Sequence, residues 1–318
     1  ICAVSGVQSQ AESMWRQLNK HNIPRIIFTN KMDRGGADFY RAVQMVKDKL
    51  GGIPLVLQMP LGSEESFRGV VDLVTMEEVN LEDQSRVPYS PSCPERDKLL
   101  EVLSDFDERI MEGWLEGQEI PVELLKKVIR EQTIANKIVP ILCGSALKDK
   151  GIELLLNAVI DYLPEPTIES GAPLSALAFK LQNDPHMGHL TFVRVYSGML
   201  IAGKYIYNSS VNKKERAGRL LRMHANDRTD IQELHAGDIG CVVGLKNTVT
   251  GDTLCDPEHI VLLESIAFPD AVVSIAVEPG TKMDIDKLGM ALQRLAKDDP
   301  TLKVSTDAET GQIIVGGL

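Results

Sequence analysis

The sequence predicts an α/β domain built on a parallel sheet, then a β-barrel domain, then part of an α+β domain. Up to Pro164, buried-strand patterns alternate with amphipathic helical patterns, which is typical of a parallel sheet covered by helices. Farther on, short β-branched runs separated by glycines and Asn-Asp turns are typical of a small closed barrel, and one β-α-β-β unit follows. We expect domains at 1–168, 172–267 and 268–318, with an insertion in the first at about 53–137.

Apolar spacing and capping residues place the elements of the first domain. Asp38 is an N-cap candidate for a helix, and Gly51 with Gly52 would end that helix. Strands are expected at 1–4, 24–30, 53–62, 66–74 and within 137–147, with the third and fourth paired. Helices are expected at 11–20, 39–50, from Pro94 along an apolar stripe to Trp114, from Pro121, and at 152–163. The charged tract 77–94 is expected to be rich in turns.

A linker rich in Pro, Gly and Ser at 164–173 separates this domain from the barrel. Barrel strands are expected within 174–182, 190–198, 204–210, 215–224 and 236–245. The last unit should contain strands within 271–279, 302–307 and 311–318, and a helix over 284–299.

Composition excludes several classes of protein. The formal charge of -11 and the pI near 5.1 oppose attraction of the whole surface to polyanions, so a nucleic-acid partner needs a local basic patch. The five cysteines form no C-x-x-C pair and the histidines add no ligand spacing, so we expect a reducing compartment and no metal site. No apolar run approaches the roughly 18 residues that cross a bilayer, and the chain does not open like a signal peptide.

Asn30-Lys31-Met32-Asp33 follows an apolar strand directly and has the Asn-Lys-x-Asp pattern that reads guanine. A carboxylate such as Asp33 accepts the adjacent N1–H and N2–H donors of guanine together, and adenine does not present this pair. Asn30 can bond the ring N7 and tie neighbouring loops, while the stem of Lys31 covers the ring face. Ligands of open α/β sheets bind at the carboxyl ends of the strands, where this segment is predicted to lie.

The second half of a guanine site requires a backbone N–H directed at O6. Ser145-Ala146-Leu147 follows the strand "KIVPIL", and we expect the amide of Ala146 to supply that donor. The alternative interpretation is structural, with Asp33 in a turn beside two glycines and Ser145 as a helix cap. Two such loops, each at a strand end, favour the guanine site.

The phosphate half of a nucleotide site is not found in this sequence. The nearest match to G-x-x-x-x-G-K-[ST] starts at Gly198 and places Tyr205 where the magnesium-binding hydroxyl is needed. It also lies in strand-and-turn texture, so we interpret it as a barrel turn. The D-x-x-G matches at Asp33, Asp48 and Asp286 are explained by caps and turns.

Longer segments resemble translation elongation factor G over essentially the whole chain. These are "SGVQSQAESMWRQLNKHNIPRIIFTNKMDRGGADF", "GVVDLV", "CGSALKDKGIELLLNAVIDYLPEP", "FVRVYSG", "RLLRMHAND" and "GDTLC". The resemblance implies a partial P-loop GTPase-type sheet with an α+β insertion, a barrel, and a partial ferredoxin-like α+β domain. It implies a translational GTPase that moves tRNA and mRNA on the ribosome, with GTP or GDP bound and Mg²⁺ in the full-length parent.

In that family the phosphate loop, switch I and the segment with the catalytic histidine precede the equivalent of Ile1. We therefore expect an internal fragment that retains only the guanine half of the site, at Asn30, Lys31, Asp33, Ser145, Ala146 and Leu147. No catalytic residue and no metal ligand can be assigned here. The fragment alone is expected neither to hydrolyse GTP nor to bind it tightly, because phosphate-loop and magnesium contacts supply much of the affinity.

The resemblance also implies ribosomal partners. A basic run on the predicted barrel would face small-subunit RNA, through Lys213, Lys214, Arg216, Arg219 and Arg222. The segment Glu95 to Glu131 holds eleven acidic and six basic residues, and the family implies contact there with the stalk protein of the large subunit. A solvated surface is the alternative for both. A monomeric parent and a cytoplasmic or organellar-matrix location are expected, without a membrane partner.

Two other functions stay open at this stage. One is a paralogue specialised for ribosome recycling or tetracycline protection, whose distinguishing domains would lie beyond Leu318. The other is a non-hydrolysing ribosome-binding module expressed in this short form.

Overall fold

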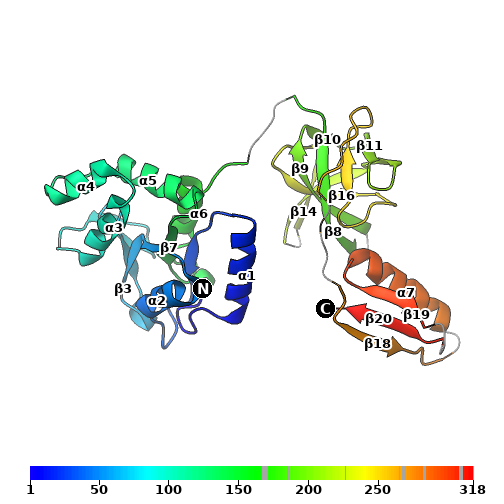
Figure 1. Cartoon of the computed structure of the whole chain (residues 1–318), viewed down its shortest axis with the longest axis horizontal. Helices are drawn as coiled ribbons and strands as arrows, with labels where there is room; N and C mark the ends of the chain where they lie inside the picture. Colours follow the sequence, from blue (N-terminus) through cyan, green and yellow to red (C-terminus); the bar gives the residue numbers. More distant parts are fainter. Residues whose placement is uncertain are drawn as a thin grey trace. The chain divides into compact units, whose positions relative to one another are not determined.

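The structure, a computed structural model, describes residues 1–166, 171–184, 187–225, 227–264, 266, 270–281, 284–307 and 311–317. Two compact units, Ile1–Glu165 and Pro166–Leu318, make up the chain (Figure 1). The expected domain limits at 168, 267, 268 and 318 lie outside the described residues.

The first unit combines helices with two sheets. Its helices are α1 Ser9–Lys20, α2 Phe39–Leu50, α3 Pro94–Ser104, α4 Glu108–Leu115, α5 Val122–Ile134 and α6 Ile152–Tyr162, with 3₁₀ turns η1 Glu64–Ser66 and η2 Ala146–Lys148. Its strands are β1 Ile27–Thr29, β2 Pro54–Val56, β3 Gln58–Leu61, β4 Gly69–Asp72, β5 Glu77–Asn80, β6 Arg86–Pro88 and β7 Val139–Cys143.

The predicted parallel sheet is confirmed, with strand order β1-β7-β2. Every residue of the central strand β7 is buried, because helices cover both of its faces. Ile141 packs in the cluster that includes Trp15 and Phe39 from α1 and α2, whereas Leu142 packs in the cluster that includes Leu125 from α5. Strands buried on both faces have near-continuous apolar runs, which is why "IVPILC" was predictable.

The expected strand at 53–62 is divided between two sheets. Its first part is β2, which pairs parallel with β7. Its second part is β3, which pairs antiparallel with β4 as predicted. In the tract 77–94, which was predicted to be rich in turns, the strands β5 and β6 were missed, and they extend this antiparallel sheet in the order β3-β4-β5-β6. The buried Val79 is the inward residue of β5, and its charged neighbours obscured the alternation.

Two further expectations differ from the structure. The single helix predicted after Pro94 is broken into α3 and α4, because the carboxylate of Asp107 accepts from the Arg109 amide at 3.0 Å and starts a new helix. The strand predicted at 1–4 is replaced by isolated bridges of Cys2, parallel to Asn30 and antiparallel to Gly6. The cap of α2 is confirmed, with the Arg41 amide donating to Asp38 at 2.9 Å.

The second unit begins with the predicted barrel-type antiparallel strands. Among the described residues they form an eight-stranded sheet, in the order β12-β11-β17-β8-β9-β16-β13-β14, and a two-stranded sheet, β10-β15. Val193, Val195, Leu220 and Leu254 are among the buried residues of its core. The strands are β8 Ser175–Asp184, β9 Gly188–Ser197, β10 Met199–Ile201, β11 Tyr205–Asn208, β12 Lys213–Arg216, β13 Arg219–His224, β14 Asp227–Ile231, β15 Glu233–His235, β16 Ile239–Val243 and β17 Thr253–Cys255.

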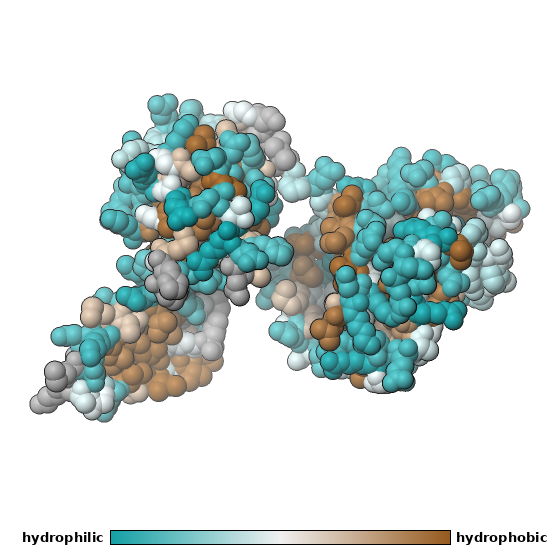
Figure 2. All heavy atoms as spheres, turned by 180° about the vertical axis from the view of Figure 1, so that it is seen from behind, coloured by the Kyte–Doolittle hydropathy of each residue, from teal (hydrophilic) through white to brown (hydrophobic). Residues whose placement is uncertain are grey.

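The predicted β-α-β-β unit follows in the remainder of the chain. It contains β18 Val273–Val277, α7 Ile285–Asp298, β19 Lys303–Thr306 and β20 Ile313–Gly317, with sheet order β18-β20-β19. Apolar side chains gather on the surface of this part (Figure 2), and those of Val273 and Ile275 are 58% and 64% exposed.

Candidate functional site

The first predicted guanine loop leaves the carboxyl end of β1. Asn30 continues the strand, since its N–H donates to the Ile1 carbonyl at 2.8 Å. Lys31 then adopts a left-handed φ of +67°, and the chain turns inward. Met32 is 1% exposed and its amide donates to the Gly144 carbonyl at 3.1 Å. The buried Met32 therefore anchors the loop and leaves Lys31 exposed and Asp33 half-buried.

The second predicted loop leaves the carboxyl end of β7, the neighbour of β1. Ser145 is buried, and its backbone exchanges hydrogen bonds with Lys150 at 2.9 and 3.0 Å, which closes the loop. Gly144 is required here, because a Cβ at this position would lie 2.2 Å from the Lys150 carbonyl oxygen. Ala146 and Leu147 follow in η2, and the side chain of Leu147 is 87% exposed.

The side chain of Asn30 joins the two loops. Its Oδ1 accepts from the Ala146 amide at 2.9 Å and from the Lys31 amide at 2.7 Å. The structure thus contains the loop tie expected of Asn30. The Ala146 amide, which was expected to meet O6 of the base, donates to this side chain in the structure.

Asp33 lies in an electrostatic setting that favours its ionised form. The neighbouring Ser145 hydroxyl, and then Lys148, hold the pKa of this carboxyl below its ordinary value. The Lys148 ammonium lies 3.3 Å from Asp33 Oδ2, and the side chains are 55% and 14% exposed, respectively. An ionised carboxylate is the acceptor that the N1–H and N2–H donors of guanine require.

Sequence reasoning missed two residues that hold these loops in place. Glu64 accepts from the Gly36 amide through Oε1 at 2.6 Å. Lys150 donates to the Phe67 carbonyl at 3.1 Å and to Glu82 Oε1 at 3.0 Å. All three interactions join residues from distant parts of the sequence, and nothing in the local pattern of "SEES" or "LKDKG" indicates them.

Three protein families match successive parts of the chain. The family described as the elongation factor Tu GTP binding domain matches residues 1–165. Elongation factor G domain 2 matches 173–257, and elongation factor G domain III matches 268–318. The chain belongs to the translational GTPases of the elongation factor G type.

A solved structure extends the similarity to the whole chain. A Thermus thermophilus protein of known crystal structure is 27% identical in sequence to this chain, and the two structures superpose with a TM-score of 0.85. The similarity covers 100% of this chain and 49% of the Thermus chain. The present sequence therefore spans about half the length of that relative.

The predicted basic run lies on two strands. Lys213, Lys214 and Arg216 are exposed on β12, whereas Arg219 and Arg222 are exposed on β13. These strands are not neighbours in the sheet order. Arg219 is paired with Asp230 at 2.8 Å, so the run is less uniformly positive than its sequence indicates.

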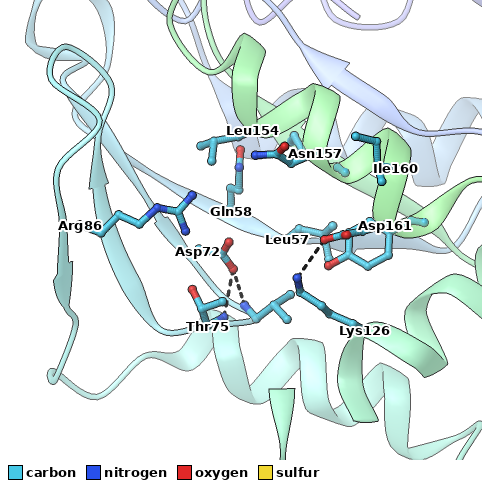
Figure 3. A pocket seen from close by; sticks show the side chains of 14 residues that line it. Leu57, Gln58, Asp72, Thr75, Arg86, Lys126, Leu154, Asn157, Ile160 and Asp161 are labelled. Atoms are coloured by element: carbon cyan, nitrogen blue, oxygen red, sulfur yellow. Dashed lines mark hydrogen bonds and ion pairs between the residues drawn. The ribbon is translucent and has the colours of Figure 1, made fainter. Parts of the chain in front are cut away.

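A cavity of about 260 Å³ lies elsewhere in the first unit and is lined by residues from the antiparallel sheet, α5 and α6 (Figure 3). Lys126 is paired with Asp161 at 2.9 Å. Asp72 accepts from the Val74 and Thr75 amides at 2.8 and 3.1 Å. None of the predicted guanine residues lines this cavity, so it is separate from the candidate site.

Within the described part of the chain, no group of three or more His, Cys, Asp or Glu side chains is arranged to hold a metal ion. None of its helices combines the length and apolar character needed to cross a membrane.

Proposed function

We propose that this chain is part of a ribosomal translocation GTPase, which couples GTP hydrolysis to the movement of tRNA and mRNA. The loops at Asn30 and Ser145 are proposed as the guanine half of its nucleotide site. The observation that carries this proposal is the hydrogen bond from Ala146 to Asn30. It holds together two loops with guanine-reading patterns, at the carboxyl ends of adjacent parallel strands, where nucleotides bind in open α/β folds.

Each loop residue has a chemical role in this proposal. Asp33 accepts the N1–H and N2–H groups of guanine, and its lowered pKa keeps it ionised at neutral pH. The exposed stem of Lys31 covers one face of the ring, and Asn30 orients both loops. The backbone of the η2 residues Ala146 and Leu147 is proposed to lie at the O6 edge of the base, next to the Ala146–Asn30 hydrogen bond.

We further propose that these 318 residues alone neither hydrolyse GTP nor bind it tightly. The sequence contains no G-x-x-x-x-G-K-[ST] loop, and phosphate and magnesium contacts contribute much of the affinity in nucleotide sites. Mg²⁺ binding by the full-length parent stays a prediction, and no catalytic residue is assigned within this chain.

Base selectivity tests the guanine site directly. Saturation-transfer NMR, which detects weak complexes, would measure the dissociation constants of GDP and ADP for the whole chain. We expect GDP to bind at least about tenfold more tightly, since two charge-assisted hydrogen bonds distinguish the bases. Asp33→Asn should bind xanthosine diphosphate more tightly than GDP, because an amide N–H can donate to the C2 carbonyl that xanthine has in place of the N2 amino group of guanine.

Asp149→Asn is the matched control, since Asp149 is exposed in the second guanine loop and has a left-handed φ of +56° that asparagine also tolerates. It should leave the base preference unchanged. Equal affinity of the native chain for GDP and ADP would contradict the proposed site.

The proposed partners follow from the family. The exposed basic residues of β12 and β13 are proposed to meet small-subunit ribosomal RNA. The acidic helices of the insertion are proposed to meet the stalk protein of the large subunit. We propose that the parent is monomeric and acts in the cytoplasm or an organellar matrix.

A further inference from the structure

Glu64, which lies in the insertion, contacts the first guanine loop at two points that flank Asp33. Its carboxylate accepts from the Gly36 amide at 2.6 Å. Its own amide donates to the Met32 carbonyl at 2.9 Å. One residue of the insertion therefore holds both ends of the segment 32–36, which contains Asp33. The hydrogen bond to the Glu64 carboxylate is charge-assisted, which makes it stronger than a hydrogen bond between two neutral groups.

We propose that Glu64 is a positioning residue for guanine recognition, which fixes Asp33 at the distance and angle needed to bond the base. This inference rests on the proposed function, because it assigns a role in the same site. It adds that the insertion, which supplies no residue to the predicted base contacts, determines how well the loop discriminates among bases.

The backbone around Glu64 is built to hold this side chain in one place. Glu64 has a left-handed φ of +55°, a conformation that is uncommon for residues other than glycine and costs free energy. Ser63 and Ser66 close the turn: the Ser66 hydroxyl accepts from the Ser63 amide at 3.1 Å and donates to the Ser63 carbonyl at 2.7 Å. Gly62 is needed at its start, since a Cβ there would lie 2.2 Å from the Ser66 carbonyl oxygen.

The same segment of the insertion also holds the second guanine loop. Phe67, which follows the Glu64 turn, is 2% exposed and packs in the hydrophobic cluster that contains Met32. Its carbonyl accepts from Lys150 at 3.1 Å, and Lys150 closes the loop of Ser145. The segment 62–67 is thus the common support of the two loops, and Glu64 is its charged contact with the Asp33 side.

Discrimination between GDP and inosine diphosphate tests the role of Glu64. Inosine retains N1–H and lacks the N2 amino group, so the ratio of the two dissociation constants measures the second bond to Asp33. Saturation-transfer NMR on the whole chain would compare the native protein with Glu64→Ala and Glu64→Gln. Glu65→Gln is the matched control, because Glu65 is exposed in the same turn. Hydrogen exchange at the Gly36 amide would be measured in parallel.

We expect Glu64→Ala to reduce the GDP preference over inosine diphosphate several-fold and to speed exchange at Gly36 about tenfold. Glu64→Gln, which retains an acceptor oxygen, should give intermediate values, and Glu65→Gln should resemble the native protein. A general loss of stability would weaken binding of both nucleotides equally and leave their ratio unchanged.

The outcomes separate this inference from the proposed function. If the native chain shows no preference for GDP over ADP, the guanine site itself is wrong and the role of Glu64 fails with it. A second outcome is that the native chain prefers GDP over ADP while Glu64→Ala and Glu65→Gln show the same ratio of dissociation constants for GDP and inosine diphosphate. In that case only the positioning role of Glu64 is overturned. If Glu64→Ala does not fold, Glu64→Gln provides the test. Native-like exchange at the Gly36 amide and an unchanged ratio of GDP to inosine diphosphate dissociation constants in Glu64→Gln would overturn the positioning role.

Discussion

The side-chain oxygen of Asn30 accepts a hydrogen bond from the Ala146 amide at 2.9 Å, although 116 positions separate the two residues. This bond joins the loops that follow β1 and β7. The same oxygen accepts from the Lys31 amide at 2.7 Å. Asn30 therefore satisfies two backbone donors at a point where the chain leaves regular sheet pairing.

Asn30→Ala should remove both bonds and destabilise the first unit by about 1–2 kcal/mol, the range for hydrogen bonds of this kind. Both tryptophans, Trp15 and Trp114, lie in this unit, so urea unfolding followed by tryptophan emission measures its stability selectively. Asn30→Asp retains acceptor oxygens and should lose less. Equal loss in the two variants would contradict a role for the acceptor oxygen.

The pKa of Asp33 predicts a pH dependence of stability. Ser145 and Lys148 lower this pKa in the folded protein, below the value of about 3.9 for an unperturbed aspartate. The resulting stabilisation is present above the unfolded-state pKa and is lost as pH falls through the folded-state pKa. Asp33→Asn should therefore be less stable than the native chain at pH 6, with a difference that shrinks below about pH 4.

Urea midpoints from tryptophan emission between pH 3 and 7 would measure this difference. Asp149→Asn is again the control, because Asp149 is exposed and should show no comparable trend. A gap between the native chain and Asp33→Asn that stays constant over this range would contradict the assignment.

The sequence predicted the parts of the site that depend on local chemistry. Asn30 and Asp33 follow a buried apolar strand, and Asp38 caps the next helix, so each was visible within a few residues. Glu64 and Lys150 were missed because their partners, Gly36 and Phe67, are distant in the sequence and a charged residue in a polar turn resembles an ordinary solvated one.

The same limit explains the errors in the fold. The run 53–62 is continuous in composition, and only tertiary pairing decides that β2 joins β7 while β3 joins β4. Within 77–94, Val79 is the one buried residue of β5. A single buried residue gives too weak an alternation of apolar and polar positions to indicate a strand. The position of the break between α3 and α4 depends on a single capping residue, Asp107.

The barrel contains a buried carboxylate whose stability role can be tested. Glu215 is 6% exposed, and it accepts from the amides of Lys246 and Asn247 at 2.6 and 3.0 Å and from the Thr248 hydroxyl at 2.8 Å. Burial would raise its pKa, but these donors outweigh burial and the pKa is lowered. The donors of the loop at 246–248 therefore stabilise the ionised form of Glu215.

Glu215→Gln should destabilise the barrel by about 2 kcal/mol, because charge-assisted bonds become neutral and one acceptor oxygen is replaced by a donor. Native-state hydrogen exchange at the buried Val242 amide would measure this change in the second unit. Glu258→Gln, at an exposed position, should have no effect. Unchanged exchange at Val242 in Glu215→Gln would show that the loop does not need the charge.

We expect Arg219 and Arg222 to contribute differently to RNA binding, although both are exposed on β13. Arg219 already forms two bonds with Asp230, at 3.0 and 2.8 Å. Arg222 forms no ion pair within the part of the chain that the structure describes. If the barrel meets ribosomal RNA as proposed, Arg222 is available for a phosphate, whereas Arg219 would first have to leave its carboxylate partner.

Arg222→Gln should therefore weaken binding to isolated small ribosomal subunits more than Arg219→Gln, even though each variant loses one positive charge. Binding measured between about 50 and 200 mM salt should show a slope in log affinity against log salt that is reduced by about 1 for Arg222→Gln. Arg219→Gln should leave that slope nearly unchanged, because neutralisation by Asp230 means that few counterions are released at this position. A larger effect of Arg219→Gln would contradict the predicted ranking of the two arginines, and equal slopes in both variants and the native chain would place the RNA contact away from β13.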